Sequence, residues 1–274
     1  KYEEKIVTTQ LYPNCPGIAN QIEALKNKIQ LLSKQLQQAS PGQKPFIAEQ
    51  IKECNLEISK KKKELNDCIK NTPINKKYQE VVKTHPGIGK PVGAERVCDD
   101  KIGHYQDYDG GASIYWAPST GAHLIYGLIR NKWIKLGREK GPNGYPTTDE
   151  SNAGSGKGRY NNFQQGTIIW KKGASEAFSV YGAIYNRWGD TGLDSGALGF
   201  PLSDEQSTVG NTGRFNDFEH GAIYYQPGKG THVIKSPVHE ACTLVGREYG
   251  NMKFPLVDTG NPSGNPPSVS QKFQ

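Results

Sequence analysis

The chain contains little that points to a membrane span, a metal site or a catalytic centre. None of its apolar runs approaches about 18 residues, so no transmembrane helix is expected. The six histidines show no helical pairing with an acidic residue, which argues against zinc, and no other cofactor is expected. No serine stands in a Gly-x-Ser-x-Gly elbow, and the glycine-rich stretch 154–158 lacks the spacing of a phosphate-binding loop. We therefore expect that the chain is not an enzyme.

Arginine is absent from the first 83 residues, although the chain as a whole is basic, with a formal net charge of +7. These residues hold 15 lysines against nine acidic side chains, so they carry most of the excess. The lysines gather in the run Lys60–Lys63, on an expected helix that has most of its perimeter in solvent. Nucleic-acid binding needs basic groups on one face together with aromatic or guanidinium contacts, so no nucleic-acid partner is expected.

Hydrophobic residues make up only 34% of the chain, which has 32 glycines and 17 prolines. That balance favours a turn-rich, mostly β module. The first residue is Lys1 rather than Met, and no signal peptide is present. We interpret the chain as a processed secreted protein or an excised fragment, with a cytosolic fragment as the alternative.

Residues 1–75 are expected to form an antiparallel coiled-coil hairpin. Apolar residues recur at alternating steps of three and four over 15–36 and again over 47–68, with Lys61 as the polar exception. The segment 39–45 contains two prolines and ends the first helix. A connection this short predicts antiparallel neighbours, and the hairpin is the expected route to a homo-oligomer.

The five cysteines can be assigned partly from this register. In an antiparallel pair the facing residue numbers sum to a constant, and a sum of 83 places Cys15 opposite Cys68 at the open end of the hairpin. We therefore predict a disulfide between them. Cys54 is left as a buried free thiol or as a bridge to another chain. Cys98 and Cys242 are expected to form a second disulfide between the first full repeat and the last.

The remainder of the chain is periodic. Gly-aromatic-Pro or a related turn recurs with its prolines at 91, 146, 201 and 255, a spacing of about 55 residues. Other positions keep the same register: His104, Arg159 and Arg214, then the aromatics Tyr108, Phe163 and Phe218, then Gly111, Gly166 and Gly221, then the run-ending aromatics Trp116, Trp170 and Tyr225. One unit cannot bury its own faces, so neighbouring units must stack.

Each unit is expected to hold short strands followed by one or two helical turns. In the clearest copy, residues 159–170 predict two strands around a polar turn, 176–180 predict a third, and 182–188 predict the helical turns. The first copy is one residue longer in its hairpin, which a β-bulge would accommodate.

The fold class predicted is α+β, with the hairpin followed by a β-rich array of repeats. The array spans 76–274 and divides into a partial repeat 76–96, repeats 97–151, 152–206 and 207–260, and the start of a further repeat at 266–274. A unit split between the two ends of an array is how propellers close into rings. We therefore favour a propeller-like closed array over an open solenoid.

These repeats resemble a known family. Leu198–Pro201, which is followed by a Ser-Asp-Glu segment and by the aromatic run 218–225, is similar to the LGFP repeat. That repeat occurs in secreted or wall-attached bacterial proteins, including some mycolyltransferases, and is thought to anchor them to cell-wall polysaccharide. The resemblance covers residues 78–274 and does not include the hairpin. It implies an extracellular or cell-wall location and a polysaccharide partner.

The candidate carbohydrate-binding residues come from the aromatic and polar positions of the repeats. Sugars are bound by flat apolar rings and by forked polar groups. The candidates are Arg159, Arg214, Tyr115, Tyr224, Asn161 and Asp217. Strand alternation places Tyr224 opposite Ile223 and Tyr225, so we predict Tyr224 at the surface and Tyr225 in the core. The recurring Asp-Glu pairs at 149–150 and 204–205 are interpreted as turn and cap residues.

The favoured function is non-catalytic binding of cell-wall or extracellular polysaccharide by the repeats. The alternative is an extracellular structural or adhesive protein that oligomerises through its helices and uses the repeats as a scaffold. An enzyme is a third and weaker hypothesis.

Overall fold

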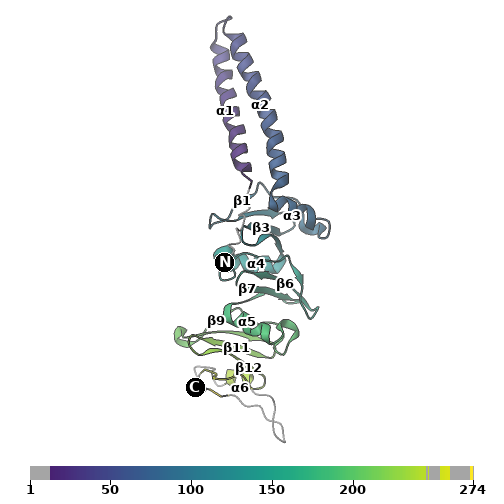
Figure 1. Ribbon diagram of the computed structural model, residues 1–274, viewed down its shortest axis with the longest axis vertical. Helices are drawn as coiled ribbons and strands as arrows, with labels where there is room; N and C mark the ends of the chain where they lie inside the picture. Colours follow the sequence, from purple (N-terminus) through teal and green to yellow (C-terminus); the bar gives the residue numbers. More distant parts are fainter. Residues whose placement is uncertain (1–12, 245, 247–253, 260–271, 274) are drawn as a thin grey trace, which may run out of the picture. The chain divides into compact units, whose positions relative to one another are not determined.

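The computed structural model describes residues 13–244, 246, 254–259 and 272–273. They form an α+β protein with helices first and three small antiparallel sheets after them (Figure 1). The chain divides into two compact units, residues 1–83 and residues 84–274. This division falls later than the boundary predicted at residue 75, because a third helix stays with the first unit. No helix in the described ranges is long and apolar enough to cross a membrane.

The first unit is a helical hairpin followed by a short helix. Its helices are α1 (Cys15–Gln38), α2 (Lys44–Asn71) and α3 (Pro73–Val81). The Asn14 side chain caps α1 by accepting a hydrogen bond from the Gly17 backbone N–H at 3.0 Å. Thr72 does the same for α3, accepting from the Asn75 N–H at 3.1 Å. Each of the three helices carries a proline in its first turn, where the missing N–H costs nothing.

The predicted seam of the hairpin is present. The side chains buried along α1 and α2 all come from the heptad positions: Cys15, Ile22, Leu32, Cys54 and Ile58. The disulfide between Cys15 and Cys68 is confirmed, with a Cα–Cα distance of 5.7 Å, and Cys54 is a buried free thiol. The exception Lys61 forms an ion pair with Glu64 of the same helix, at 2.9 Å, and its side chain is only 25% exposed.

Each repeat of the second unit builds one four-stranded antiparallel sheet followed by a helix. The strands occur in chain order within every sheet. The first repeat comprises η1 (Pro86–Ile88), β1 (Arg96–Val97), β2 (His104–Tyr108), β3 (Ala112–Ala117), β4 (Gly121–Tyr126), α4 (Gly127–Lys135) and η2 (Arg138–Lys140). The second comprises β5 (Ser151–Asn152), β6 (Gly158–Phe163), β7 (Gly166–Lys171), β8 (Phe178–Tyr181), α5 (Gly182–Asp190) and η3 (Leu193–Ser195). The third comprises β9 (Gln206–Ser207), η4 (Val209–Asn211), β10 (Arg214–Phe218), β11 (Gly221–Gln226), β12 (Gly230–Lys235) and α6 (Val238–Leu244).

The sheets of this unit alternate with helices, as Figure 1 shows for α4 and α5. Helix α4 packs against β7 of the second sheet, and α5 packs against β11 of the third. One core therefore lies between the first and second sheets, around Trp133, and the next lies between the second and third, around Trp188. The middle sheet contributes Ile168 to one core and Ile169 to the other, so both of its faces are buried.

The propeller-like closure that we expected is not confirmed. In the described part of the chain the three sheets are open, and their cores form between consecutive sheets. The further repeat predicted at 266–274 is described only at residues 272–273, where Phe273 pairs with Pro255 in an isolated β-bridge. The same bridge joins Pro91 to Tyr108 in the first repeat. Phe273 thus occupies the position expected of a repeat that follows the third.

The Leu-Gly-Phe-Pro turn is held from both sides, which explains its place in the repeat. The Trp188 indole N–H donates to the Gly199 carbonyl at 3.2 Å, and Glu219 of the next hairpin accepts from the Phe200 backbone N–H at 3.0 Å. Gly199 has φ +71°, and a Cβ there would meet the Glu219 side chain, so this position requires glycine. Each turn therefore fastens one repeat to the hairpin of the next.

The aspartate after each turn bonds to a strand of the preceding sheet, and not to a helix end as the predicted cap would. Asp149 accepts a hydrogen bond from the Leu124 backbone N–H at 2.8 Å, and Asp204 accepts one from Ser179 at 2.9 Å. Each carboxylate thereby satisfies an edge-strand donor of the preceding sheet. The bulge expected in the first copy is present, because Gly111 donates to the Tyr108 carbonyl at 3.1 Å and has φ +78°, the turn and left-handed glycine of a G1 bulge. Its extra residue lies in the three-residue turn at 109–111, and the β2–β3 ladder is uninterrupted beyond it.

Candidate functional site

Two of the six candidate carbohydrate-binding residues belong to the core. Tyr115 is 2% exposed and stacks on Tyr105 with 5.1 Å between ring centres. Tyr224 is 3% exposed and stacks in the same way on Phe215, at 5.3 Å. The prediction that Tyr224 is a surface residue is wrong, and Tyr225 is only partly buried. A stack of layers covers both faces of a strand, so alternation alone does not tell which residue meets solvent.

Asn161 is a structural residue as well. Its side chain is fully buried, and its amide donates to the carbonyls of Leu124 at 3.0 Å and Thr148 at 2.9 Å. Asn216 repeats the arrangement one repeat later, with Ser179 and Ser203 as acceptors. The asparagine thus ties a strand of one sheet to the edge of the preceding sheet and to the turn between them.

Asp217 and Arg214 lie nearer to the surface. Asp217 is partly buried and faces His239, with 3.2 Å between its carboxylate and the imidazole Nε2. Arg214 is partly exposed and lies 3.6 Å from Glu205. Among the contacts of the described residues, neither Arg214 nor Asp217 bonds to Tyr115, Tyr224 or Asn161. The six candidates are equivalent or neighbouring positions of different repeats.

Arg159 is the candidate that lies at a cavity. It comes from β6 and reaches back to the preceding repeat, where its Nε donates to Glu150 at 2.9 Å and one terminal nitrogen donates to the Tyr126 hydroxyl at 3.2 Å. A second terminal nitrogen donates to Asn152 at 2.7 Å. The guanidinium is therefore held in one orientation by the two repeats that it joins.

The cavity beside Arg159 measures about 470 Å³. Its lining residues are Tyr126, Gly127, Leu128, Ile129, Glu150, Arg159 and Trp170. Trp170, near the end of β7, is partly exposed, and its indole N–H is satisfied by the Ala174 carbonyl at 2.8 Å. The flat face of the indole is therefore the part of this side chain that remains for a ligand.

A second cavity, of about 210 Å³, shares Tyr126 as a wall. Its other lining residues are His85, Gly87, Ile88, Gly110, Ala112 and Leu124. The His85 and Tyr126 rings lie 6.0 Å apart. We call the two cavities together the Tyr126 groove. Tyr126 lines both cavities, and each has a second aromatic ring, Trp170 in the larger and His85 in the smaller.

Burial governs the charge of the groove. It raises the pKa of the Glu150 carboxyl above its usual value of 4.5, and the hydrogen bond from Arg159 opposes that rise. Burial also raises the pKa of the Tyr126 hydroxyl, which stays protonated and able to donate. Within the described ranges, no group of three or more His, Cys, Asp or Glu residues is placed to hold a metal ion. The groove presents aromatic faces and a buried ion pair, which suits binding of a polar, ring-shaped ligand.

Sequence reasoning missed Tyr126, although a signal for it exists. Tyr126 and Tyr181 are 55 residues apart, and each precedes the glycine that opens a helix. The carboxylates predicted only as turn and cap residues have a different role. Glu150 and Glu205 both recur opposite an arginine of the following strand. Extending the register by these two positions would have predicted the tyrosine, glutamate and arginine as one cluster.

The disulfide expected between Cys98 and Cys242 is wrong. Cys98 is a buried free thiol in the core between the first and second sheets, whereas Cys242 is buried in α6, which follows the third sheet. The second and third sheets lie between them, and a disulfide needs Cα atoms within about 7 Å. Burial raises the pKa of the Cys98 thiol to about 12.

We expect native Cys98 to resist alkylation by iodoacetamide at pH 8. The thiolate is the reactive form, and a pKa of about 12 leaves roughly one thiol in 10⁴ ionised at that pH. In the unfolded chain the thiol ionises near its ordinary pKa of 9.0, so its contribution to stability is present below about pH 9 and is lost as the pH rises towards 12. Peptide mass spectrometry after native and denatured labelling measures this. Labelling of native Cys98 at the denatured rate would contradict it.

The comparison with protein families agrees with the repeats seen in the structure. The LGFP repeat family matches residues 88–141, 144–196 and 198–242, which is more than half of the chain. Each match contains one sheet or most of one, and the second and third begin at the turn that joins them to the preceding repeat. A search of curated proteins finds no match. The chain belongs to the LGFP-repeat family.

Proposed function

We propose that the repeat array binds a polysaccharide of the cell wall or the extracellular matrix without altering it chemically. The observation that carries this proposal is the Tyr126 groove, whose two cavities share Tyr126 as a lining residue. Consecutive rings of a polymer fit the two cavities, with Trp170 and Tyr126 stacking on ring faces and Glu150 accepting from hydroxyls.

The family and the cysteines support an extracellular or wall-associated location. The LGFP repeat indicates a repeat module of a secreted or cell-wall protein. The disulfide between Cys15 and Cys68 is compatible with an oxidising compartment. Repetition also favours a polymer as ligand. Tyr181, Glu205 and Arg214 form the same kind of cluster one repeat later as Tyr126, Glu150 and Arg159 form at the groove. Weak sites with a Kd of roughly millimolar gain avidity when several of them bind one polysaccharide chain.

Replacing Trp170 with alanine is expected to weaken binding to insoluble wall polysaccharide about tenfold, which corresponds to about 1.4 kcal/mol. The reason is the loss of the indole face in the larger cavity. Co-sedimentation with the polymer measures the affinity. The variant Trp170→Phe, which keeps a smaller flat ring, should have an affinity between those of the unchanged protein and Trp170→Ala.

The control is Leu202→Ala, because Leu202 is 54% exposed and does not line the groove. Its binding should equal that of the unchanged protein. Thermal midpoints of all variants show whether folding is affected. If Trp170→Ala and the control are both folded and bind the polysaccharide equally well, the groove is not the binding site.

A second candidate function is structural, with oligomers formed by the helical hairpin. It is favoured by large apolar side chains that the hairpin leaves in solvent: Leu31, Phe46 and Leu56 are 58%, 69% and 59% exposed. Light scattering behind a sizing column separates the two candidates. Multimers that bind no wall polymer would favour the structural role, and a monomer that binds polymer would favour the first.

A further inference from the structure

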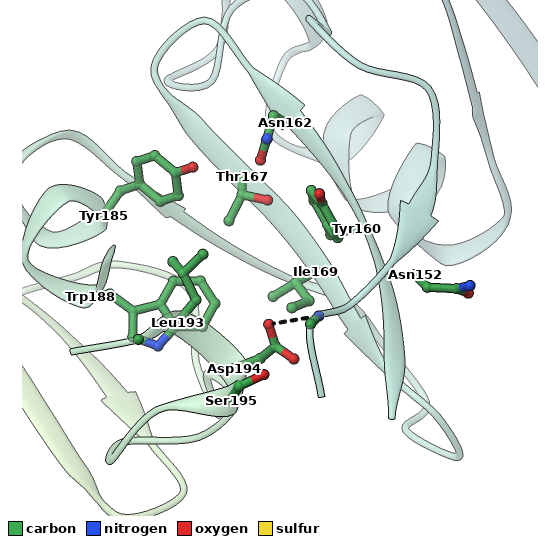
Figure 2. Close-up of a pocket in the computed structure, with 12 residues that line it drawn as sticks. Asn152, Tyr160, Asn162, Thr167, Ile169, Tyr185, Trp188, Leu193, Asp194 and Ser195 are labelled. Carbon is green, nitrogen blue, oxygen red and sulfur yellow. Dashed lines mark hydrogen bonds between the residues drawn. The ribbon is translucent and has the colours of Figure 1, made fainter. Parts of the chain in front are cut away.

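A separate cavity lies within the middle repeat, between its sheet and the helix that follows. It measures about 210 Å³, below the ~300–1,000 Å³ of sites for drug-sized ligands, so it suits a single ring. Its lining residues are Asn152, Gly154, Tyr160, Asn162, Thr167, Ile169, Tyr185, Trp188, Gly192, Leu193, Asp194 and Ser195. Figure 2 shows Tyr160 and Tyr185 on opposite sides of Ile169 and Thr167, with Asp194 and Ser195 below them. We call it the Asn162 pocket.

The Asn162 pocket is lined by polar groups that the fold does not use. The hydroxyls of Tyr160 and Tyr185 and the side-chain amide of Asn162 take part in no hydrogen bond within the described ranges, whereas the neighbouring Asn161 amide donates twice. All three side chains are partly buried, and burial raises the pKa of the Tyr185 hydroxyl. Partly buried polar groups without partners are available to a ligand that supplies them.

The first repeat fills the corresponding space with its own side chains. At the position of Ile169 it has Tyr115, which stacks on Tyr105 with 5.1 Å between ring centres. At the positions of Asn162 and Tyr185 it has Asp107 and Arg130, which form an ion pair at 3.1 Å. The space is therefore occupied by a stacked aromatic pair and a salt bridge.

The third repeat fills it in the same way with different residues. Tyr224 stands at the position of Ile169 and stacks on Phe215 at 5.3 Å. Asp217 faces His239, at 3.2 Å, across the place where the middle repeat has Asn162 and Tyr185. In the middle repeat an aliphatic side chain replaces the stacking tyrosine, and two neutral polar residues replace the Asp107–Arg130 ion pair of the first repeat and the Asp217–His239 contact of the third. Both changes open the space.

The charges around the Asn162 pocket define the ligand further. No lysine, arginine or histidine is among its lining residues. Its one carboxylate, Asp194, accepts from the backbone N–H groups of Gly154 at 3.3 Å and Ser155 at 2.8 Å, and it retains lone pairs for hydroxyl donors. An anionic ligand would meet this carboxylate without a balancing cation. A neutral ring that carries several hydroxyls would find an acceptor, two phenols and an amide.

We propose that the Asn162 pocket binds a single neutral sugar ring and is the specificity-determining subsite of the array. Its biological meaning rests on the proposed polysaccharide function, but the pocket is distinct from the Tyr126 groove. The first and third repeats keep the fold while their version of the space is filled. The middle repeat supplies selectivity for an uncharged sugar.

The test introduces the side chains that fill the space in the first repeat at the equivalent positions of the middle repeat. Ile169→Tyr restores the stacked pair, and the double variant Asn162→Asp with Tyr185→Arg restores the ion pair. The probes are methyl glycosides of glucose, galactose and arabinose, with glucuronic acid as the anionic comparison. Proton–nitrogen NMR follows the side-chain amide of Asn162 during titration of the full chain. The matched control is Ile102→Tyr, the same exchange at a site 60% exposed.

We expect at least one neutral glycoside to shift the Asn162 amide with a Kd near ~1 mM, and glucuronic acid to bind at least about tenfold more weakly. Ile169→Tyr should reduce the affinity about tenfold or more, and Ile102→Tyr should not change it. If Ile169→Tyr fails to fold, the double variant is judged by fluorescence titration against the same probes.

Two results would overturn the inference: no shift of Asn162 with any neutral glycoside, or equal binding by the filled variants. If polymer binding depends on Trp170 but no glycoside shifts the Asn162 amide signal, the pocket proposal is rejected and the groove proposal is retained. If glycosides bind at Asn162 but the protein binds no polymer, the pocket proposal is retained and the groove proposal is rejected.

Discussion

Replacing both Cys15 and Cys68 with serine is expected to lower the free energy of unfolding of the helical hairpin by about 4 kcal/mol. The disulfide closes a loop with a sequence separation of 53, and the chain-entropy treatment assigns about that value to a loop of this length. The hairpin has little else to resist unfolding, because two helices bury one narrow seam. We expect the variant to lose much of its helical structure under mild denaturing conditions.

The two units can be monitored separately in this experiment. All four tryptophans lie in the second unit, so their fluorescence reports on the repeats. Far-ultraviolet circular dichroism at 222 nm is dominated by the long helices. A urea titration should show the helical transition at lower urea in the variant, with the fluorescence transition unchanged. Treatment of the unchanged protein with dithiothreitol should reproduce this shift. If neither the serine substitutions nor dithiothreitol changes the urea midpoint of the helical transition, the prediction is refuted.

The second large effect is expected at Asn161. Its change to alanine removes two hydrogen bonds and leaves the Leu124 and Thr148 carbonyls without them in a buried place, at a cost of about 2–4 kcal/mol. Because Asn161 joins two sheets and the turn between them, the loss should be felt across both repeats. The tryptophan fluorescence transition in urea is the measurement.

The adjacent asparagine provides the matched control. Asn162 is the next residue along the same strand, and its side chain forms no hydrogen bond within the described ranges. Asn162→Ala should therefore change the free energy of unfolding by no more than about 0.5 kcal/mol. Equal destabilisation by the two changes would show that the buried amide has no special role.

The repeating and helical patterns could be predicted because they depend on spacing. The heptad steps place the seam residues, and the antiparallel sum that pairs Cys15 with Cys68 follows from the connection alone. The turn at Leu198–Pro201 and its copies set the repeat length, and the strands of 159–170 follow from alternation around Gly166. These features are local or periodic, so a single chain displays them.

The candidate site was harder to predict, because it depends on which faces are covered. Alternation along β11 separates Tyr224 from Tyr225 correctly, but stacked layers bury both sides of the strand. Cys98 and Cys242 illustrate the same limit, since counting cysteines says nothing of the layers between them. Tyr126 and Arg159 meet only because the end of one repeat lies beside the start of the next.

The bridge between each turn proline and the following repeat has a consequence for how such proteins change length. Every joint uses the same pairing, as Pro146 with Phe163 and Pro201 with Phe218. A duplicated unit inserted at any joint would meet the same partner surface on both sides, so existing contacts would be kept. Gene duplication can therefore extend the reach of the array in whole units, while substitutions inside one unit, such as Ile169, diversify it without disturbing its neighbours.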